Sequence, residues 1–117
     1  MSQYHEPLEK LDEKTLNITR AITSLKEEVE AVDWYNQRTN ASADEELKAI
    51  MAHNRDEEIE HACMLLEWLR RNMDKWDEEL RTYLFTDGPI AHLEAQATGG
   101  GSSSSSEEGD LGIGDLK

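Results

Sequence analysis

Cysteine is nearly absent from this sequence. Cys63 is the only cysteine among 117 residues, so no disulfide can form within one copy of the chain. This usage is typical of proteins from reducing compartments. Because Cys63 lies in the apolar run 62–66, we expect it to be a small core residue rather than a nucleophile.

Long apolar runs are also missing. No stretch approaches the roughly 20 consecutive apolar residues that a membrane-spanning helix needs. Residues 1–6 have neither the basic start nor the apolar run of a signal peptide. We therefore expect a cytoplasmic protein whose foldable part forms one small domain.

Positive charge is scarce. The chain has 12 Lys and Arg residues against 26 Asp and Glu residues, which gives a formal net charge of −14. Such a surface repels phosphates and argues against binding to nucleic acid. It attracts cations instead. Acidic surfaces also keep many proteins soluble, so the total charge alone does not decide between these two roles.

Glycine and internal proline are absent from the first long helical pattern. Pro7 is suited to a first helical turn, and the pattern predicts a helix from about Leu8 to Gln37. Apolar residues recur there at helical spacings and form one wide stripe, made of Leu11, Ile18, Ile22, Leu25, Val29 and Val32.

A second helical pattern follows after a short interruption. Residues 39–44 are rich in turn and N-cap formers, and the next pattern extends from about Glu45 to Arg71. Two long helices with a short connection predict an antiparallel hairpin. One hairpin leaves its apolar stripe open to water. The fold prediction is therefore all-α, with two copies pairing into a four-helix bundle.

The C-terminal third has weaker patterns. After residue 72 the helix either continues or restarts through about residue 85, and a turn at 87–89 precedes a short helix to about Ala95. Residues 98–109 form a Gly/Ser/Glu-rich linker. Spaced aliphatic residues return in 110–117, which suits a tethered peptide that docks in a groove of another protein.

Glu28 interrupts the apolar stripe of the first helix. It lies three residues after Leu25 and four before Val32, so it shares their face. A carboxylate there is unfavourable unless it is paired or binds a metal. Taken alone, Glu28 is explained more simply by a salt bridge at the edge of the stripe.

His61 lies near the middle of the apolar face of the second helix. Alone it would more often be a core histidine, but Glu57 and Glu58 precede it by four and three residues. Helical periodicity does not separate these two glutamates. Glu58 is preferred because Glu-x-x-His is the spacing found in carboxylate-bridged di-iron bundles.

The predicted metal ligands are therefore Glu28, Glu58 and His61. A four-helix di-iron site uses two Glu helices and two Glu-x-x-His helices, and one hairpin supplies one of each. A second copy would complete the site. Carboxylates with one imidazole and no thiolate suit iron or manganese better than structural zinc. Two Fe(II) ions can deliver two electrons to one O₂, which is the chemistry of a ferroxidase.

The stretches 27–35, 53–62 and 66–71 closely resemble the encapsulated ferritins, half-ferritin cargo proteins of encapsulin nanocompartments. The resemblance covers most of residues 5–95. It implies a ferritin-like helical domain over 1–97, the linker over 98–109, and an encapsulin cargo-loading peptide over 110–117. It also implies dimers around an intersubunit di-iron centre, a decameric ring of those dimers, and an encapsulin shell that stores the oxidised iron.

The resemblance also assigns roles to individual residues. Glu28, Glu58 and His61 are expected to bind the iron. Glu27 and Glu30 are expected to form an outer, weaker metal site. Trp34 and Tyr35 are expected around the centre, with Tyr35 as its supporting partner and a candidate catalytic residue.

Two other functions compete with a ferroxidase. A peroxide-consuming, rubrerythrin-like di-iron protein would share the fold, although such chains usually carry two Glu-x-x-His motifs, and this sequence has one. A helical scaffold would use its buried carboxylates only for specificity. Variants at Glu28 or His61 separate the scaffold from the enzymes.

Overall fold

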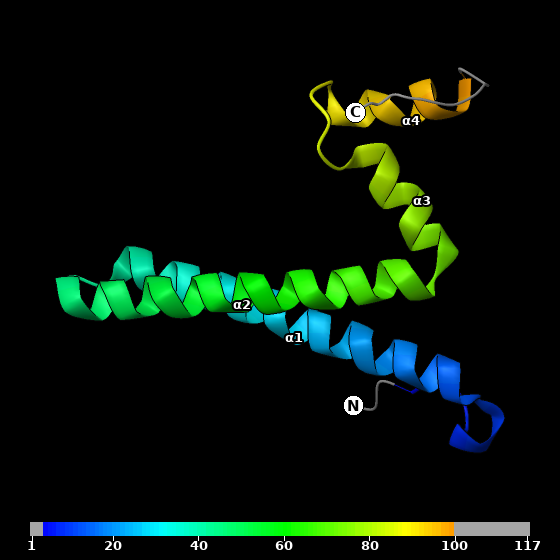
Figure 1. Ribbon diagram of the computed structural model, residues 1–117. Helices are drawn as coiled ribbons and strands as arrows, with labels where there is room; N and C mark the ends of the chain where they lie inside the picture. Colours follow the sequence, from blue (N-terminus) through cyan, green and yellow to red (C-terminus); the bar gives the residue numbers. More distant parts are fainter. Residues whose placement is uncertain (1–3, 100–117) are drawn as a thin grey trace. The chain divides into compact units, whose positions relative to one another are not determined.

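The computed structural model describes residues 4–99, and this part of the chain is helical without strands (Figure 1). The elements are a 3₁₀ helix η1 (Leu8–Lys10) and the α-helices α1 (Glu13–Ala41), α2 (Glu45–Asn72), α3 (Asp74–Tyr83) and α4 (Ile90–Gly99). The all-α prediction is confirmed. Most of the predicted linker 98–109 and all of the predicted docking peptide 110–117 lie outside the described residues.

Side-chain caps fix where the two long helices begin. Asp12 accepts a hydrogen bond from the backbone N–H of Thr15 at 2.8 Å, and Asp44 accepts one from the N–H of Leu47 at 2.8 Å. Each cap satisfies an N–H group that the first helical turn leaves without a partner. The predicted start at Leu8 is therefore wrong, because α1 begins at Glu13 after a separate 3₁₀ turn.

Helices α1 and α2 pack against each other as the predicted antiparallel hairpin (Figure 1). Residues 42–44 connect them, and the side chain of Arg55 donates across the pair to Asn36 Oδ1 at 3.1 Å. Only Ala21 and Leu69 are buried hydrophobic residues in these two helices. Each long helix therefore keeps part of its apolar surface in contact with water.

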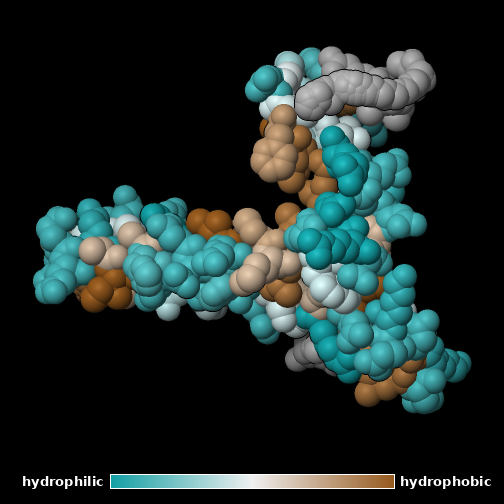
Figure 2. Space-filling view, in the orientation of Figure 1, coloured by the Kyte–Doolittle hydropathy of each residue, from teal (hydrophilic) through white to brown (hydrophobic). Residues whose placement is uncertain are grey.

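Apolar side chains interrupt the hydrophilic surface of the hairpin (Figure 2). The large hydrophobic residues exposed on α1 and α2 are Ile22, Val29, Trp34, Leu47, Ile50, Ile59 and Met64. Cys63 is exposed as well, so the prediction that it is a core residue is wrong. The reason is geometric: α1 covers only one side of α2, and apolar positions on the other sides stay open.

Contacts within the chain define two compact units, with the boundary after Asp74. In the C-terminal unit, Phe85 has a positive φ of 58° between α3 and α4, and Leu93 of α4 is buried. A Cβ at Gly88 would lie 3.5 Å from Leu93 Cδ2, so the loop passes close to α4. No helix in the described part of the chain has the length and apolar character needed to cross a membrane.

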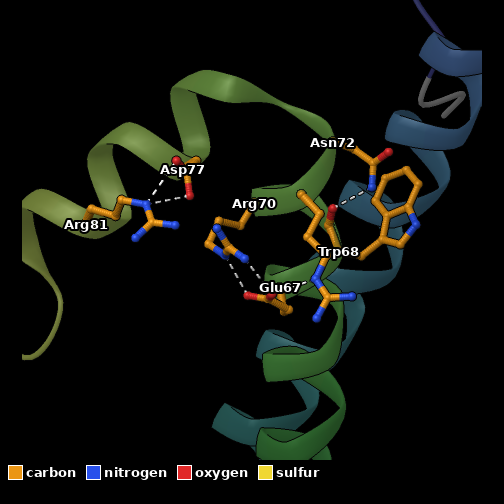
Figure 3. Close-up of polar contacts among 7 residues, drawn as sticks. Glu67, Trp68, Arg70, Asn72, Asp77 and Arg81 are labelled. Atoms are coloured by element: carbon orange, nitrogen blue, oxygen red, sulfur yellow. Dashed lines mark hydrogen bonds and ion pairs between the residues drawn. The ribbon is translucent and has the colours of Figure 1, made fainter.

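The carboxylate of Glu67 lies between two guanidinium groups near the end of α2 (Figure 3). It accepts two hydrogen bonds from Arg70 at 2.8 Å and one from Arg71 Nε at 2.7 Å. These bonds, those from Arg70 first, lower the pKa of Glu67 to about 2. Figure 3 also shows Asn72 bonded to the Trp68 carbonyl within α2, and Arg81 bonded to Asp77 within α3.

Glu67→Gln is expected to make the free energy of unfolding less dependent on pH in the acidic range. Because the folded pKa of Glu67 lies below its ordinary value, its ionised form stabilises the fold above about pH 4.5, and this contribution is lost as the pH falls toward 2. The variant should be less stable at neutral pH and lose less stability over that range. Urea unfolding at fixed protein concentration measures both effects. Glu60→Gln, an exposed change on the same helix, is the control, and a parallel wild-type and Glu67→Gln pH profile would contradict the assignment.

Candidate metal centre

The short connection between α1 and α2 determines which residues of the two helices lie opposite each other. Glu28 on α1 and Glu58 on α2 lie at equal sequence distances on either side of Ala43, the middle residue of the connection. Helices that leave one turn with the same rise per residue bring such positions side by side. His61 follows Glu58 by three residues and lies on the same face of α2. The sequence therefore predicts the meeting of all three side chains.

The three predicted ligands do meet. One ligand atom from each of Glu28, Glu58 and His61 lies within 4.8 Å of the other two. His61 Nδ1 is 3.2 Å from Glu58 Oε1 and 3.4 Å from Glu28 Oε1. Among the described residues, this is the one group of three or more metal-binding side chains that lie this close together.

One oxygen of this cluster has no hydrogen bond. Glu28 Oε1 is buried and lacks a hydrogen-bond partner among the described residues, although the Glu28 side chain as a whole is 25% exposed. A buried carboxylate oxygen without a partner is unfavourable. A cation bound between Glu28, Glu58 and His61 would satisfy it. Two carboxylates and an imidazole are a donor set that fits iron or manganese.

The two carboxyl groups influence each other. A hydrogen bond with Glu58, together with burial and the negative charge of Glu58, raises the pKa of Glu28. The same hydrogen bond lowers the pKa of Glu58. The two carboxyl groups therefore lie close enough for each to change the acidity of the other. A cation between them would offset their negative charge.

The pKa of His61 is also shifted. Burial lowers the pKa of its ring, but the hydrogen bond with Glu58 and the charges of Glu28 and Glu58 outweigh burial, so the pKa is raised. The three side chains thus form a group with excess negative charge that attracts positive charge in the form of protons. This electrostatic character suits a cation-binding site.

The other predicted site residues are not part of this cluster. Glu27 and Glu30 are exposed on α1, and the outer metal site remains a prediction. Trp34 is exposed and lines a shallow hollow. The ring of Tyr35 lies under the guanidinium of Arg38, at 5.2 Å from its centroid. Within residues 4–99, the Tyr35 hydroxyl has no hydrogen bond with the three ligands, so its supporting role also remains a prediction.

Glu57 is a neighbour of the cluster that the ligand prediction set aside in favour of Glu58. Its Oε1 lies 3.9 Å from His61 Nε2, and its Oε2 lies 3.9 Å from His53 Nε2. The spacing of four residues on either side of Glu57 is the sequence signal for both contacts. Glu57 and Glu58 therefore approach different nitrogens of the same imidazole ring.

Comparison with known protein families gives a match that includes the three clustered residues. The sequence pattern of the EncFtn-like family matches residues 3–87. The chain belongs to this family. The resemblance to encapsulated ferritins is therefore confirmed, and the match spans the helices that carry Glu28, Glu58 and His61.

Two curated relatives of this EncFtn-like chain are similar over almost its whole length. An encapsulated ferritin-like protein from Rhodospirillum rubrum is 60% identical over 121 aligned residues, covering 97% of this chain and 86% of that protein. A ferritin-like protein from Thermotoga maritima is 59% identical, with 95% of each chain covered. A crystal structure of protein ne0167 from Nitrosomonas europaea is 62% identical, with a TM-score of 0.75 over 78% of this chain and all of that one.

Proposed function

We propose that this protein is a ferroxidase, which oxidises Fe(II) to Fe(III) with O₂ at a di-iron centre shared between two copies of the chain. The observation that carries the proposal is the meeting of Glu28, Glu58 and His61 around a buried oxygen without a hydrogen bond. The EncFtn-like family and its ferritin-like relatives support an iron-related role.

Fe(II) is the substrate of the proposed reaction. Two Fe(II) ions lose one electron each, and one O₂ takes up both electrons and two protons to leave as hydrogen peroxide. This stoichiometry avoids a one-electron reduction to superoxide. Iron bound at the cluster supplies the redox chemistry, since none of the three side chains is itself oxidised.

The side chains of the chain bind the ions and offset their charge. Glu28 and Glu58 contribute carboxylates, which favour the additional positive charge of Fe(III) over Fe(II). His61 contributes a ring nitrogen, Nδ1, that faces both carboxylates. Preformed negative charge at partly buried positions therefore favours the oxidised product.

A second copy completes the proposed centre. One chain offers two carboxylates and one imidazole, which is half of the ligand set of a four-helix di-iron site. The exposed apolar residues of α1 and α2 give two hairpins a reason to associate. We propose that the dimers assemble further into a decameric ring.

The proposed place of action is an encapsulin shell in the cytoplasm. The name of the Rhodospirillum rubrum relative, an encapsulated ferritin-like protein, supports this location. Residues 110–117, with their spaced aliphatic side chains, would dock the protein inside the shell. The shell would also store the oxidised iron.

One experiment with two proteins tests both parts of this proposal. The full-length chain and a variant without residues 110–117 are each supplied with Fe(II) and either O₂ or H₂O₂, and Fe(III) formation is followed by absorbance. Both proteins should oxidise Fe(II) with O₂ at the same rate, well above that in buffer. Only the full-length chain should co-purify with a co-expressed encapsulin shell.

Each part has its own contradictory result. Equal co-purification of both proteins would contradict the docking role of residues 110–117. Oxidation that needs H₂O₂ and ignores O₂ would favour a rubrerythrin-like reaction. A rate equal to that in buffer with either oxidant would favour a helical scaffold.

A further inference from the structure

Three large apolar side chains are exposed around the connection between α3 and α4. Phe85 is fully exposed at 102%, Ile90 is 71% exposed, and Leu84 is exposed as well. Apolar side chains are visible on the surface of this C-terminal unit (Figure 2). Leu84, Phe85 and Ile90 are called the 84–90 patch below. Apolar residues that gather on a surface commonly mark a site of interaction.

The conformation of the connection leaves this patch in water. Leu93 of α4 is buried, and a Cβ at Gly88 would lie 3.5 Å from Leu93 Cδ2, so Leu93 packs under the connection. Phe85 has a positive φ of 58°, and the hydroxyl of Thr86 donates a hydrogen bond to the Tyr83 carbonyl at 2.8 Å. Leu93 thus takes the buried position, and the three patch residues stay exposed.

The chain contains an apolar segment that is long enough to reach the patch. Residues 110–117, which lie outside the described residues, contain three large aliphatic side chains, Leu111, Ile113 and Leu116. Residues 100–109 join this segment to the end of α4. Gly/Ser-rich linkers have a root-mean-square span of about 5–6 Å times the square root of their length, which is about 17 Å for these residues. The patch includes the first residue of α4, about 15 Å from the last one at 1.5 Å per residue.

The linker therefore matches the distance that it has to cover. A segment on a short linker of matching length has an effective concentration on the order of 1 mM at its site. Even a weak contact, with a dissociation constant of about 0.1 mM, would then be formed in about nine of ten chains. A second copy of the chain would have to reach the same millimolar concentration to compete. The linker length thus favours the chain's own segment as the occupant of the patch.

We propose that residues 110–117 bind the 84–90 patch of their own chain while no shell protein is bound. The contact is apolar, because the segment and residues 75–99 both carry more acidic than basic residues. Like charges oppose the contact at low salt, and added salt screens them.

This contact would hold the segment back from the shell. Only the undocked fraction of chains can bind another partner, so the apparent affinity for that partner falls by the same fraction. With about nine of ten chains docked, the affinity for the shell protein falls about tenfold. This consequence rests on the proposed docking of residues 110–117 in the shell, whereas the contact with the patch does not.

Photo-cross-linking of the full-length, metal-free protein tests the contact. Gly112→benzoylphenylalanine places a reactive group beside Leu111 and Ile113 and keeps all three aliphatic side chains of the segment. After illumination, mass spectrometry should find the cross-link in residues 84–93, with a yield that does not change on dilution and does not fall in 0.5 M NaCl. In an equal mixture of ¹⁵N-labelled and unlabelled chains, each cross-linked product should contain a single isotope.

A double variant removes the apolar surface of the patch. Phe85→Asn with Ile90→Ser should lower the cross-link yield at least about fivefold, since the burial of each large apolar side chain changes a binding constant by a factor of about 10 or more. Asn suits the position of Phe85 because it adopts a positive φ readily. The matched control is Leu8→Ser, which removes an exposed leucine from η1 of the N-terminal unit and should leave the yield unchanged.

Several results would overturn the proposal. An unchanged yield in the double variant, or cross-links outside residues 84–93, would mean that the segment does not bind the patch. Cross-linked products with both isotopes, in a yield that falls on dilution, would assign the patch to the segment of another copy. Absence of the cross-link, together with a shift to single chains in native mass spectrometry of the double variant, would assign the patch to direct contact between copies.

Affinity for the shell protein provides a second measurement. The full-length double variant should bind encapsulin about tenfold more tightly than wild type and oxidise Fe(II) at the same rate, since neither Phe85 nor Ile90 lies in the metal cluster. Equal affinity in both proteins would overturn the proposed masking. If wild type does not bind the shell protein, the docking role in the proposed function is wrong, and the cross-link still decides whether the segment binds the patch.

Discussion

Glu28→Ala is expected to lower Fe(II) oxidation to the rate seen without protein. In a shared centre the substitution removes one carboxylate from each copy, so both halves of the ligand set are affected at once. Removal of a group that only supports a ligand already costs about 10- to 100-fold in metal affinity or activity. The loss of Glu28, whose carboxylate lies within the cluster itself, should exceed that range.

The same substitution should leave the hairpin folded. Glu28→Ala removes a buried oxygen that lacks a hydrogen bond, and it also removes the interactions of the carboxyl group with Glu58 and His61, so the two effects oppose each other. Thermal unfolding followed by circular dichroism should therefore show a metal-free Glu28→Ala that is about as stable as wild type. Loss of activity with retained stability identifies a functional residue.

Two further variants sharpen the test. Glu28→Gln keeps the shape of the side chain and removes its charge, and it should be as inactive as Glu28→Ala. Glu46→Ala removes an exposed glutamate from the first turn of α2, far along the helix from the cluster, and should oxidise Fe(II) at the wild-type rate. Fe(III) formation near the wild-type rate in Glu28→Ala would exclude the cluster as the site of oxidation.

Divalent metal is expected to drive copies of the chain together. If the complete site exists only between two copies, metal binds the assembly and not the single chain, so it must favour association. At a free metal concentration of 100 times its dissociation constant, one such site stabilises the assembled form by about 2.7 kcal/mol. This corresponds to roughly a 100-fold decrease in the concentration of chain needed for assembly.

Native mass spectrometry across a series of protein concentrations measures this effect. Wild type with anaerobic Fe(II) or Co(II) should shift from single chains to assemblies at lower concentration than the metal-free protein. Glu28→Ala should show no metal-dependent shift, although its apolar surfaces are unchanged. Identical oligomer distributions with and without metal in wild type would contradict a site shared between copies.

Much of the candidate site was predictable because helices are regular. The three-residue spacing of Glu58 and His61 places both on one face of α2, and a short connection brings Glu28 opposite them. These are local rules that need no knowledge of distant contacts. The antiparallel hairpin followed from the same rules.

Features that depend on cap chemistry or on coverage by a second element were harder to predict. The start of α1 is set by the side chain of Asp12, although the apolar pattern begins earlier, at Leu8. Cys63 has an apolar sequence environment, but its exposure depends on which side of α2 is covered by α1. The contact between Glu57 and His61 Nε2 depends on side-chain rotation, which sequence spacing does not specify.

The small number of buried side chains in the hairpin affects how the amount of assembled centre would depend on the concentration of the chain. Because only Ala21 and Leu69 are buried hydrophobic residues in the long helices, the proposed pairing would supply much of the stability of the chain. The amount of the proposed centre would then depend on how often two copies meet. When most chains are single, doubling their concentration increases the number of pairs about fourfold. Iron-oxidising capacity would then rise more steeply than protein abundance, and a modest change in gene expression would produce a large change in the rate of iron removal.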